Sequence, residues 1–358
     1  MIDRNNTLQA TLGPYARLIC PMNRAALRPV SLEKAMVLRS DVGNFLYPII
    51  DNIIIMSPIS RQLRSMCNTF FKENSGAIAK LGIDPDPPKL TERLLAFMEK
   101  KELAWLEEEM TFWEDKFRVA LRGHGQYRLG WNRTIPRERI IADLKNEIAS
   151  GVVLEIGCGG SCTLSEIFKG SLSLYYGLDL SYYACQLSRR AFPQGIFIQS
   201  AIVPLPFREE SVDFLIAYGV FHHLPGHEAN ISKVLPVLRK GGYLIGSDPL
   251  PGFSRGVSKE KTSDMQQASS PHNDSIDWPN MVAIAKNQTV VVRVRKEYGL
   301  LRALLVMILY DRLGVRGKLF TRLVIWLDHL WLLTIGKISS RLGPRGILYL
   351  LQKRGENM

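Results

Sequence analysis

Between residues 152 and 247, short apolar runs alternate with stretches that have the spacing of a helix. The runs are too short for helices, and continuous apolar runs of this length are typical of strands buried on both faces of a parallel sheet. Strands that alternate with helices predict an α/β fold. Five strands are expected here, at 152–156, 174–180, 196–200, 211–217 and 243–247. Two later runs of β type, 288–295 and 346–353, would bring the sheet to seven strands.

The loop after the first predicted strand is rich in glycine. Gly157 and Gly159 lack a Cβ, so the backbone can turn sharply there and approach a ligand closely. The second predicted strand ends in Asp179, and an acid at this place accepts hydrogen bonds from ribose hydroxyls in nucleotide-binding α/β folds. A dinucleotide-binding fold is the alternative, but it expects a further glycine where Ser161 and Cys162 stand. That pair favours a cofactor without a phosphate.

Six motifs follow one another in the central region. They are Glu155-x-Gly157-x-Gly159, Asp179, Leu205-Pro206-Phe207, Val212-Asp213-Phe214, Phe221-His222-His223-Leu224-Pro225 and Leu238-Arg239-Lys240-Gly241-Gly242. Together they resemble class I S-adenosylmethionine-dependent methyltransferases, in the branch of the ubiquinone and menaquinone methylases. The resemblance covers about residues 137–248 and implies a doubly wound, seven-stranded Rossmann-like sheet whose last strand is antiparallel. It also implies S-adenosyl-L-methionine as the cofactor.

The resemblance assigns the cofactor contacts residue by residue. The loop of Gly157, Cys158 and Gly159 would line the methionine part, and Glu155 would hold the loop amides or the amino group of the cofactor. Asp179 would take the ribose hydroxyls, with Leu180 against the adenine. Many relatives carry an Asp after the third strand, where this chain has Ser200 and Ala201, so a main-chain contact or none is expected there. The predicted cofactor-binding set is completed by Ala201 and Tyr218.

Two adjacent histidines are the candidate catalytic residues. After the fourth strand the chain reads Ala217-Tyr218-Gly219-Val220 and lacks the Asn/Asp-Pro-Pro-Tyr motif of many methylases that act on amide or exocyclic amine nitrogens. No cysteine stands where a covalent pyrimidine methylase needs its nucleophile. An oxygen or carbon acid on a small-molecule or lipid-linked acceptor remains, and its proton must be removed. His222 or His223 could act as the base, because imidazole titrates near neutrality. Alternatively, both cap the next helix or line the cofactor pocket.

The N-terminal region, up to about residue 62, resembles a small zinc-ribbon-like β domain. That family includes the activator subunit of several methyltransferases. Members usually carry a Cys-Pro-x-Cys knuckle and a second cysteine pair, whereas this chain has Cys20 with Asn23 at the partner position and no Cys or His at 38–44. A tetrahedral zinc site needs four N/S ligands, so a metal-free relic is predicted, with an unrelated β-rich cap as the alternative.

Two regions on either side of the central motifs have helical patterns. At 63–135 we expect a helical linker, broken by the prolines at 84–88. The methyltransferase resemblance implies that the end of this region covers the cofactor, with Tyr127 and Trp131 as candidates. Residues 251–287 are polar and are expected to be mobile. Residues 298–345 are strongly apolar and punctuated by basic residues, but the internal charges exclude a membrane-spanning helix. They predict a helical cap that admits an apolar substrate and contacts a membrane surface, with ordinary core packing as the alternative.

Five regions result from these patterns. They are an accessory domain at 1–62, a linker and cofactor-covering segment at 63–135, a methyltransferase domain at 136–297, an apolar helical cap at 298–345, and a last strand with a tail at 346–358. The net charge of +12 indicates either an anionic partner or a solvated basic surface. The five scattered cysteines are typical of reduced thiols, and the polar N-terminus lacks a signal-peptide pattern, so a cytoplasmic protein is expected, with peripheral contact at the inner membrane surface left open.

The leading hypothesis is a methyltransferase that acts on a small-molecule or lipid-linked acceptor. A methylase of RNA or of a translation factor is the first alternative, favoured by the accessory-domain resemblance and by the net charge. A non-catalytic scaffold that kept the fold is the second, and the intact Glu155, Gly157, Gly159 and Asp179 argue against it. The sequence leaves the oligomeric state open.

Overall fold

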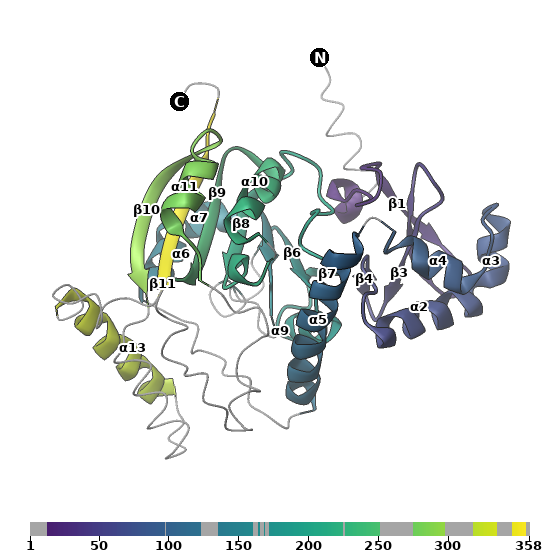
Figure 1. The fold of residues 1–358 in the computed structure, drawn as a ribbon, viewed down its shortest axis with the longest axis horizontal. Coiled ribbons are helices and arrows are strands. Elements are labelled where there is room, and N and C mark those ends of the chain that lie inside the picture. The colour runs from purple at the N-terminus through teal and green to yellow at the C-terminus, as the bar shows by residue number, and fades with distance from the viewer. Residues whose placement is uncertain are drawn as a thin grey trace.

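The computed structural model describes residues 13–96, 98–122, 135–159, 164, 168, 172–224, 226–250, 275–297, 318–334 and 346–355. Within them, eleven strands form one sheet in the order β1-β2-β3-β4-β7-β6-β5-β8-β9-β11-β10 (Figure 1). Its central strands have the order expected of a doubly wound fold, with the crossover between β5 and β8. They are β5 (Val152–Ile156), β6 (Leu174–Asp179), β7 (Ile196–Gln199), β8 (Val212–Tyr218) and β9 (Leu238–Pro249).

The central strands are parallel, and the C-terminal pair reverses direction. Strand β11 (Gly346–Lys353) is antiparallel to β9, as predicted for the last strand, and β10 (Thr289–Glu297) is antiparallel to β11. The β5 side chains from Val153 to Ile156 are all buried, which explains why the strand reads as a continuous apolar run.

The sheet has eleven strands rather than the seven expected for the methyltransferase domain, because the N-terminal strands join it. Strands β1 (Leu27–Ser31), β2 (Met36–Ser40) and β3 (Leu46–Ile50) form an antiparallel meander. A tight turn with positive φ at Asp51 and Asn52 leads from β3 into β4 (Ile53–Ile55). Strand β4 then pairs in parallel with β7, and its three isoleucines are buried.

Hydrogen bonds join the two loops in which the zinc-ribbon resemblance would place metal ligands. Asn23 donates from Nδ2 to the carbonyl of Val42 over 2.7 Å, and its Oδ1 accepts from the amide of Ala25. The sulfur of Cys20 lies 3.0 Å from the hydroxyl of Tyr47. Among the described residues, no group of three or more His, Cys, Asp and Glu side chains is arranged to hold a metal ion. The resemblance itself stays a prediction.

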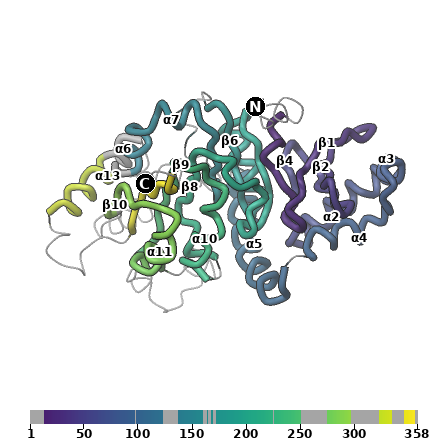
Figure 2. The backbone as a smooth tube through the Cα atoms, turned by 90° about the horizontal axis from the view of Figure 1, so that it is seen from above, coloured from purple at the N-terminus to yellow at the C-terminus, as the bar shows by residue number. Residues whose placement is uncertain are grey.

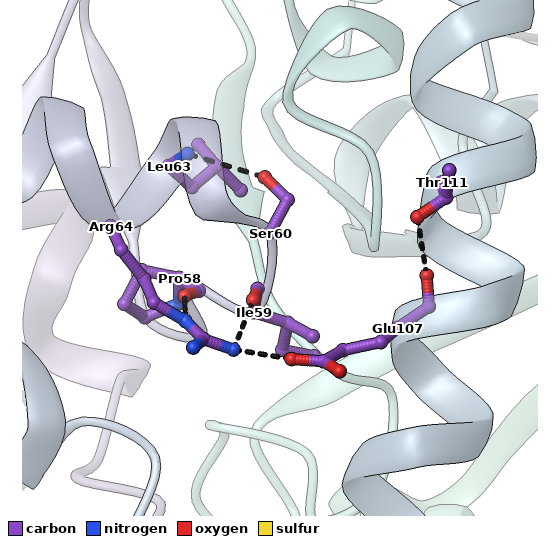
Figure 3. A network of polar contacts seen from close by, with 7 residues as sticks. All are labelled: Pro58, Ile59, Ser60, Leu63, Arg64, Glu107 and Thr111. Atoms are coloured by element: carbon purple, nitrogen blue, oxygen red, sulfur yellow. Dashed lines mark hydrogen bonds and ion pairs between the residues drawn. The ribbon is translucent and has the colours of Figure 1, made fainter.

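Four helices connect the N-terminal strands to the rest of the fold. They are α2 (Arg61–Glu73), α3 (Ser75–Lys80), α4 (Pro87–Arg93) and α5 (Lys100–Leu121). The prolines begin α4 rather than excluding a helix, because Asp86 caps it and Pro87 stands in the first turn, where its missing N–H is not needed. Figure 3 shows how α2 is tied to α5: Arg64 pairs with Glu107 and also donates to the carbonyls of Pro58 and Ile59.

The other helices and the short 3-10 turns complete the described elements. They are α6 (Ile135–Asp143), α7 (Lys145–Ser150), α9 (Tyr182–Ala191), α10 (Asn230–Val234), α11 (Trp278–Ala285) and α13 (Lys318–Leu333), with the short 3-10 turns η1 (Gly13–Arg17), η2 (Phe221–His223), η3 (His227–Ala229) and η4 (Leu235–Val237). Helix α11 lies in the region predicted to be mobile; Asp277 caps its start, and Met281 and Ala285 are buried.

Of the predicted apolar cap, α13 and Thr334 are described, while 298–317 and 335–345 lie outside the described residues. No helix in the described part of the chain is both long enough and apolar enough to cross a bilayer. Figure 2 shows α13 at one end of the molecule and α2, α3 and α4 at the other.

Candidate active site

The loop after β5 and the loop after β8 meet at the carboxyl ends of the central strands. Gly157 and Gly159 both have φ near +60°, a conformation that favours glycine. A Cβ on Gly157 would lie 2.6 Å from Cγ2 of Val220, so the close packing of the two loops also requires glycine there. A Cβ on Gly159 would meet only ordinary contacts. The loop therefore has the sharp turn and the open side that an approaching ligand needs.

Asp179 joins the ends of β5 and β6 through its carboxyl group. Its Oδ2 accepts a hydrogen bond from the amide of Gly159 and its Oδ1 accepts one from the amide of Ser181, each over 2.8 Å. Burial raises the pKa of Asp179 to about 6, against which the backbone hydrogen bonds act. The structure thus gives Asp179 a loop-holding contact that the sequence analysis had considered only for Glu155. The hydroxyl of Tyr175 donates to the buried Glu155 over 2.7 Å.

Helix α9 braces the glycine loop from behind. The amide of Cys158 donates to the carbonyl of Leu178, and the hydroxyl of Ser188 on α9 donates to the carbonyl of Gly159. The thiol of Cys158 is buried next to that of Cys185, and burial raises the pKa of both thiols. Cys158 is therefore a packed, protonated side chain, and its backbone amide and carbonyl are held by Leu178 and Ser188.

The predicted adenine and β8 residues lie at neighbouring strand ends. The amide of Ser200 donates to the carbonyl of Asp179, which brings the backbone around Ala201 next to that around Leu180. The guanidinium of Arg137, on α6, lies 4.3 Å above the ring of Tyr218 and donates to the hydroxyl of Ser247. A buried cation at the ends of β8 and β9 was not predicted from the sequence.

His222 and His223 lie in η2, directly after β8, with their ring centres 3.9 Å apart. The Nδ1 of His222 lies 2.9 Å from Oδ1 of Asp248, near the end of β9. The other oxygen of this buried carboxyl accepts a hydrogen bond from the hydroxyl of Tyr349, on β11, over 3.0 Å. The same Oδ1 also accepts from the backbone amide of His222. Asp248 therefore fixes the orientation of the His222 ring.

His223 has its own carboxyl partner, and that partner comes from α5. The Nδ1 of His223 lies 3.0 Å from Oε1 of Glu109. The indole N–H of Trp113 donates to the same oxygen over 2.7 Å, and the indole of Trp105 donates to the carbonyl of His223. Burial lowers the pKa of His223 below its usual value, although the hydrogen bond with Glu109 opposes the shift.

Helix α5 also reaches the glycine loop and the start of α9. Oε1 of Glu114 accepts a hydrogen bond from the amide of Tyr182 over 2.7 Å. Burial and the nearby charge of Asp179 raise the pKa of Glu114 to about 7. The ring of Phe117 stacks on Trp113 and approaches Gly159. The wall of the site on this side is thus built by α5.

The predicted residues that follow β5, β6, β7 and β8 lie together at the carboxyl ends of these neighbouring strands. Tyr127 and Trp131 lie outside the described residues. Sequence reasoning missed Glu109, Asp248 and Arg137. The helical spacing of Trp105, Glu109 and Trp113, four residues apart, was the available signal for the first. Asp248 directly follows the predicted fifth strand, where polar residues of α/β folds commonly face a ligand.

Residues 154–246 match the family model described as a methyltransferase domain. These residues form a methyltransferase domain. The matched part begins in β5 and ends in β9, so it includes the glycine loop, Asp179 and both histidines. Helix α5, with Glu109, lies outside it.

Two curated relatives each match less than a third of the chain. A phthiotriol/phenolphthiotriol dimycocerosates methyltransferase of Mycobacterium ulcerans is 32% identical over 110 residues, which are 29% of this chain and 40% of the relative. A fatty-acid O-methyltransferase of Mycolicibacterium smegmatis is 32% identical over 106 residues, 28% of this chain and 38% of the relative. The match thus spans about two fifths of each relative's length. Among solved structures, the N-methyltransferase NodS of Bradyrhizobium japonicum WM9, in complex with S-adenosyl-l-homocysteine, is 12% identical with a TM-score of 0.41, over 68% of this chain and 98% of that one.

Proposed function

We propose that the protein transfers a methyl group from S-adenosylmethionine to an oxygen or carbon atom of a small-molecule or lipid-linked acceptor. The observation that carries the proposal is the pair of histidine–carboxyl contacts, His222 with Asp248 and His223 with Glu109, at the carboxyl end of β8. An acceptor hydroxyl or carbon acid must lose a proton during transfer, and a histidine held by a carboxylate is suited to take it. The names of the two curated relatives, a dimycocerosate and a fatty-acid methyltransferase, support a lipid-like acceptor.

The residues around the glycine loop fit the cofactor. The turn of Gly157 and Gly159 offers an open backbone surface to the methionine part. Asp179 uses one lone pair on each oxygen for the loop amides, so its carboxylate keeps acceptor capacity for the ribose hydroxyls. Leu180 and Ala201 would border the adenine, while Glu155, Cys158 and Tyr218 would shape the rest of the pocket. S-adenosylmethionine supplies a methyl group that is already activated, so the protein contributes alignment and a dry site.

His223 is proposed as the base, and Glu109 as the residue that positions it. An indole nitrogen only donates, so Oε1 of Glu109 acts as an acceptor toward Trp113, and Nδ1 of His223 then donates to the same oxygen. This places the lone pair of the neutral ring on Nε2. The lowered pKa keeps the ring neutral at physiological pH, ready to accept a proton. The Glu109 carboxylate would then stabilise the imidazolium that forms.

His222 is the second candidate base and has the same arrangement of atoms. Asp248 accepts hydrogen bonds from Tyr349 and from the amide of His222, so it acts as a carboxylate acceptor and Nδ1 of His222 donates to it. Because the His222 side chain is less exposed, at 8% against 17% for His223, His223 is favoured. Loss of turnover in His222→Asn with full activity in His223→Asn would reverse this choice.

The experiment that tests the function is transfer of labelled methyl groups from S-adenosylmethionine into a fractionated lysate. Lipid, RNA, protein and small-molecule pools are counted separately, and Asp179→Ala serves as the cofactor-binding control. Label in the lipid or small-molecule pool is expected. Label confined to the RNA or protein pool would favour the alternative, a methylase of RNA or of a translation factor. Cofactor binding without label in any pool would favour a non-catalytic scaffold. A cytoplasmic location is part of the proposal and is tested by fractionation of cells.

A further inference from the structure

Helix α13 exposes a stripe of large apolar side chains to solvent. The stripe consists of Leu323, Trp326, Leu330 and Leu333, which are 50%, 52%, 39% and 48% exposed. They follow one another at intervals of three, four and three residues, so they lie on one face of the helix. At 1.5 Å per residue, the stripe is roughly 15 Å long. Single exposed apolar residues are common, but a continuous stripe of this kind marks an interaction surface.

The opposite face of α13 is turned toward the protein. Val324 and Asp328 are buried, at 1% and 4% exposure, and the helix contacts α6 and β10. Burial and the charge of Arg139 on α6 lower the pKa of His329, and the neighbouring Asp328 opposes this shift. The helix therefore buries Val324 together with an acid and leaves Trp326 outside, whereas an ordinary surface helix exposes its acids and buries its large apolar side chains. Exposing this much apolar surface is unfavourable in water, so the stripe is expected to be covered by an apolar phase.

The sequence on either side of the stripe is basic, and this charge indicates the occupant. Residues 299–345 contain eight Lys and Arg residues and two Asp residues, which makes the region strongly basic. Two copies of such a region would repel one another across a shared interface, whereas the headgroups of anionic lipids would attract each copy. Trp is also enriched where apolar side chains meet the headgroup layer of a bilayer. The basic character and Trp326 together favour a lipid surface over a second copy of the chain.

We infer that α13 lies in the plane of an anionic membrane surface, with Leu323, Trp326, Leu330 and Leu333 inserted at the boundary between headgroups and acyl chains. Figure 1 shows α13 at the periphery, where it projects from the β10 end of the sheet and away from the N-terminal strands. Helices α2, α3 and α4 lie at the opposite end of the molecule from α13 (Figure 2). Association at the surface would bring a lipid-linked acceptor to the enzyme, but the surface contact itself does not depend on the proposed function.

Flotation of the full-length protein with lipid vesicles tests this inference. The vesicles contain phosphatidylcholine alone or phosphatidylcholine mixed with phosphatidylglycerol. The double variant Trp326→Gln/Leu330→Gln removes two side chains of the stripe, and Val119→Gln on α5 changes an apolar side chain of similar exposure elsewhere. Wild type and Val119→Gln are expected to float with the anionic vesicles, less so at high salt. The double variant should bind at least about tenfold more weakly.

A second measurement reports the depth of Trp326. Lipids brominated on their acyl chains should quench part of the tryptophan fluorescence of the wild type. In Trp326→Phe, which keeps the apolar surface, that quenching should fall while binding persists. Failure to bind anionic vesicles at low salt, or equal binding by the double variant, would overturn the inference. A dimer in sedimentation equilibrium that the double variant dissociates would instead identify a second copy as the occupant. None of these readouts uses methyl transfer, so they stand apart from the test of the proposed function.

Discussion

The imidazole of His223 and the carboxyl group of Glu109 face each other, with 3.0 Å between Nδ1 and Oε1. The histidine follows β8 of the methyltransferase domain, whereas the glutamate belongs to α5, which precedes that domain in the chain. Two tryptophans of the same helix, Trp105 and Trp113, add hydrogen bonds to this pair. Helix α5 therefore contributes directly to the candidate catalytic site.

Replacing Glu109 by Gln should lower turnover while S-adenosylmethionine binding stays near its original strength. A charge-assisted hydrogen bond to the imidazolium contributes about 1.5–3 kcal/mol, so kcat should fall on the order of tenfold to a hundredfold. Because Glu109 raises the pKa of His223, its loss should also move the acid limb of the pH–rate profile to lower pH. Steady-state kinetics across pH check both effects. An unchanged profile in Glu109→Gln would separate the glutamate from the base.

Changing Asp179 to Ala should weaken binding of S-adenosylmethionine and of its demethylated product alike. Each ribose hydrogen bond to a carboxylate contributes about 1.5–3 kcal/mol. The pKa of Asp179 is raised to about 6, so its acceptor form is lost as the pH falls through about 6, and cofactor affinity should fall over the same range. Calorimetry of wild type and Asp179→Asn measures this, since the amide does not titrate. Because the pKa of Glu114 lies at about 7, Glu114→Gln is the matched control, and it should keep the pH dependence near 6.

Gly157→Ala should lower the free energy of unfolding of the protein more than Gly226→Ala does. Both glycines have positive φ, so both substitutions incur a strain of roughly 1–2 kcal/mol. The added methyl group meets Val220 at 2.6 Å in the first case and nothing within 4 Å in the second. The overpacking should add about 1–3 kcal/mol, measurable by urea unfolding, and should reduce cofactor binding. Combining Gly157→Ala with Val220→Ala should recover part of the loss; no recovery would mean that the clash is not the cause.

The purified protein should contain no structural zinc. Asn23 stands at a position where the zinc-ribbon resemblance expects a ligand, and it is held by Val42 and Ala25. A chelator should therefore leave the unfolding midpoint unchanged, while Asn23→Ala should lower the free energy of unfolding by about 0.5–1.5 kcal/mol through its lost hydrogen bonds. Atomic absorption together with thermal unfolding tests this. One tightly held equivalent of zinc would show that ligands have been overlooked.

The local patterns of the sequence were sufficient for the central strands. The apolar run of β5, the glycines after it and the acid at Asp179 could be predicted because each follows from neighbouring residues or from its place at the carboxyl end of a parallel strand. The order of the motifs correctly placed both histidines after β8. The partners of those histidines were not predictable in the same way, because Glu109 reaches His223 only through the packing of α5. A three-residue strand such as β4 likewise carries no signal that names β7 as its partner.

The pairing of β4 with β7 has a consequence for how the chain can be divided. Strand β7 has β6 on one side and β4 on the other, so its backbone N–H and C=O groups are satisfied on both sides only while the N-terminal strands are present. A shortened chain without residues 27–55 would turn β7 into a bare sheet edge rich in apolar side chains. Such edges recruit other strands and promote aggregation. The N-terminal strands thus cover the edge that β7 would otherwise expose, and so protect the catalytic sheet from pairing with other chains.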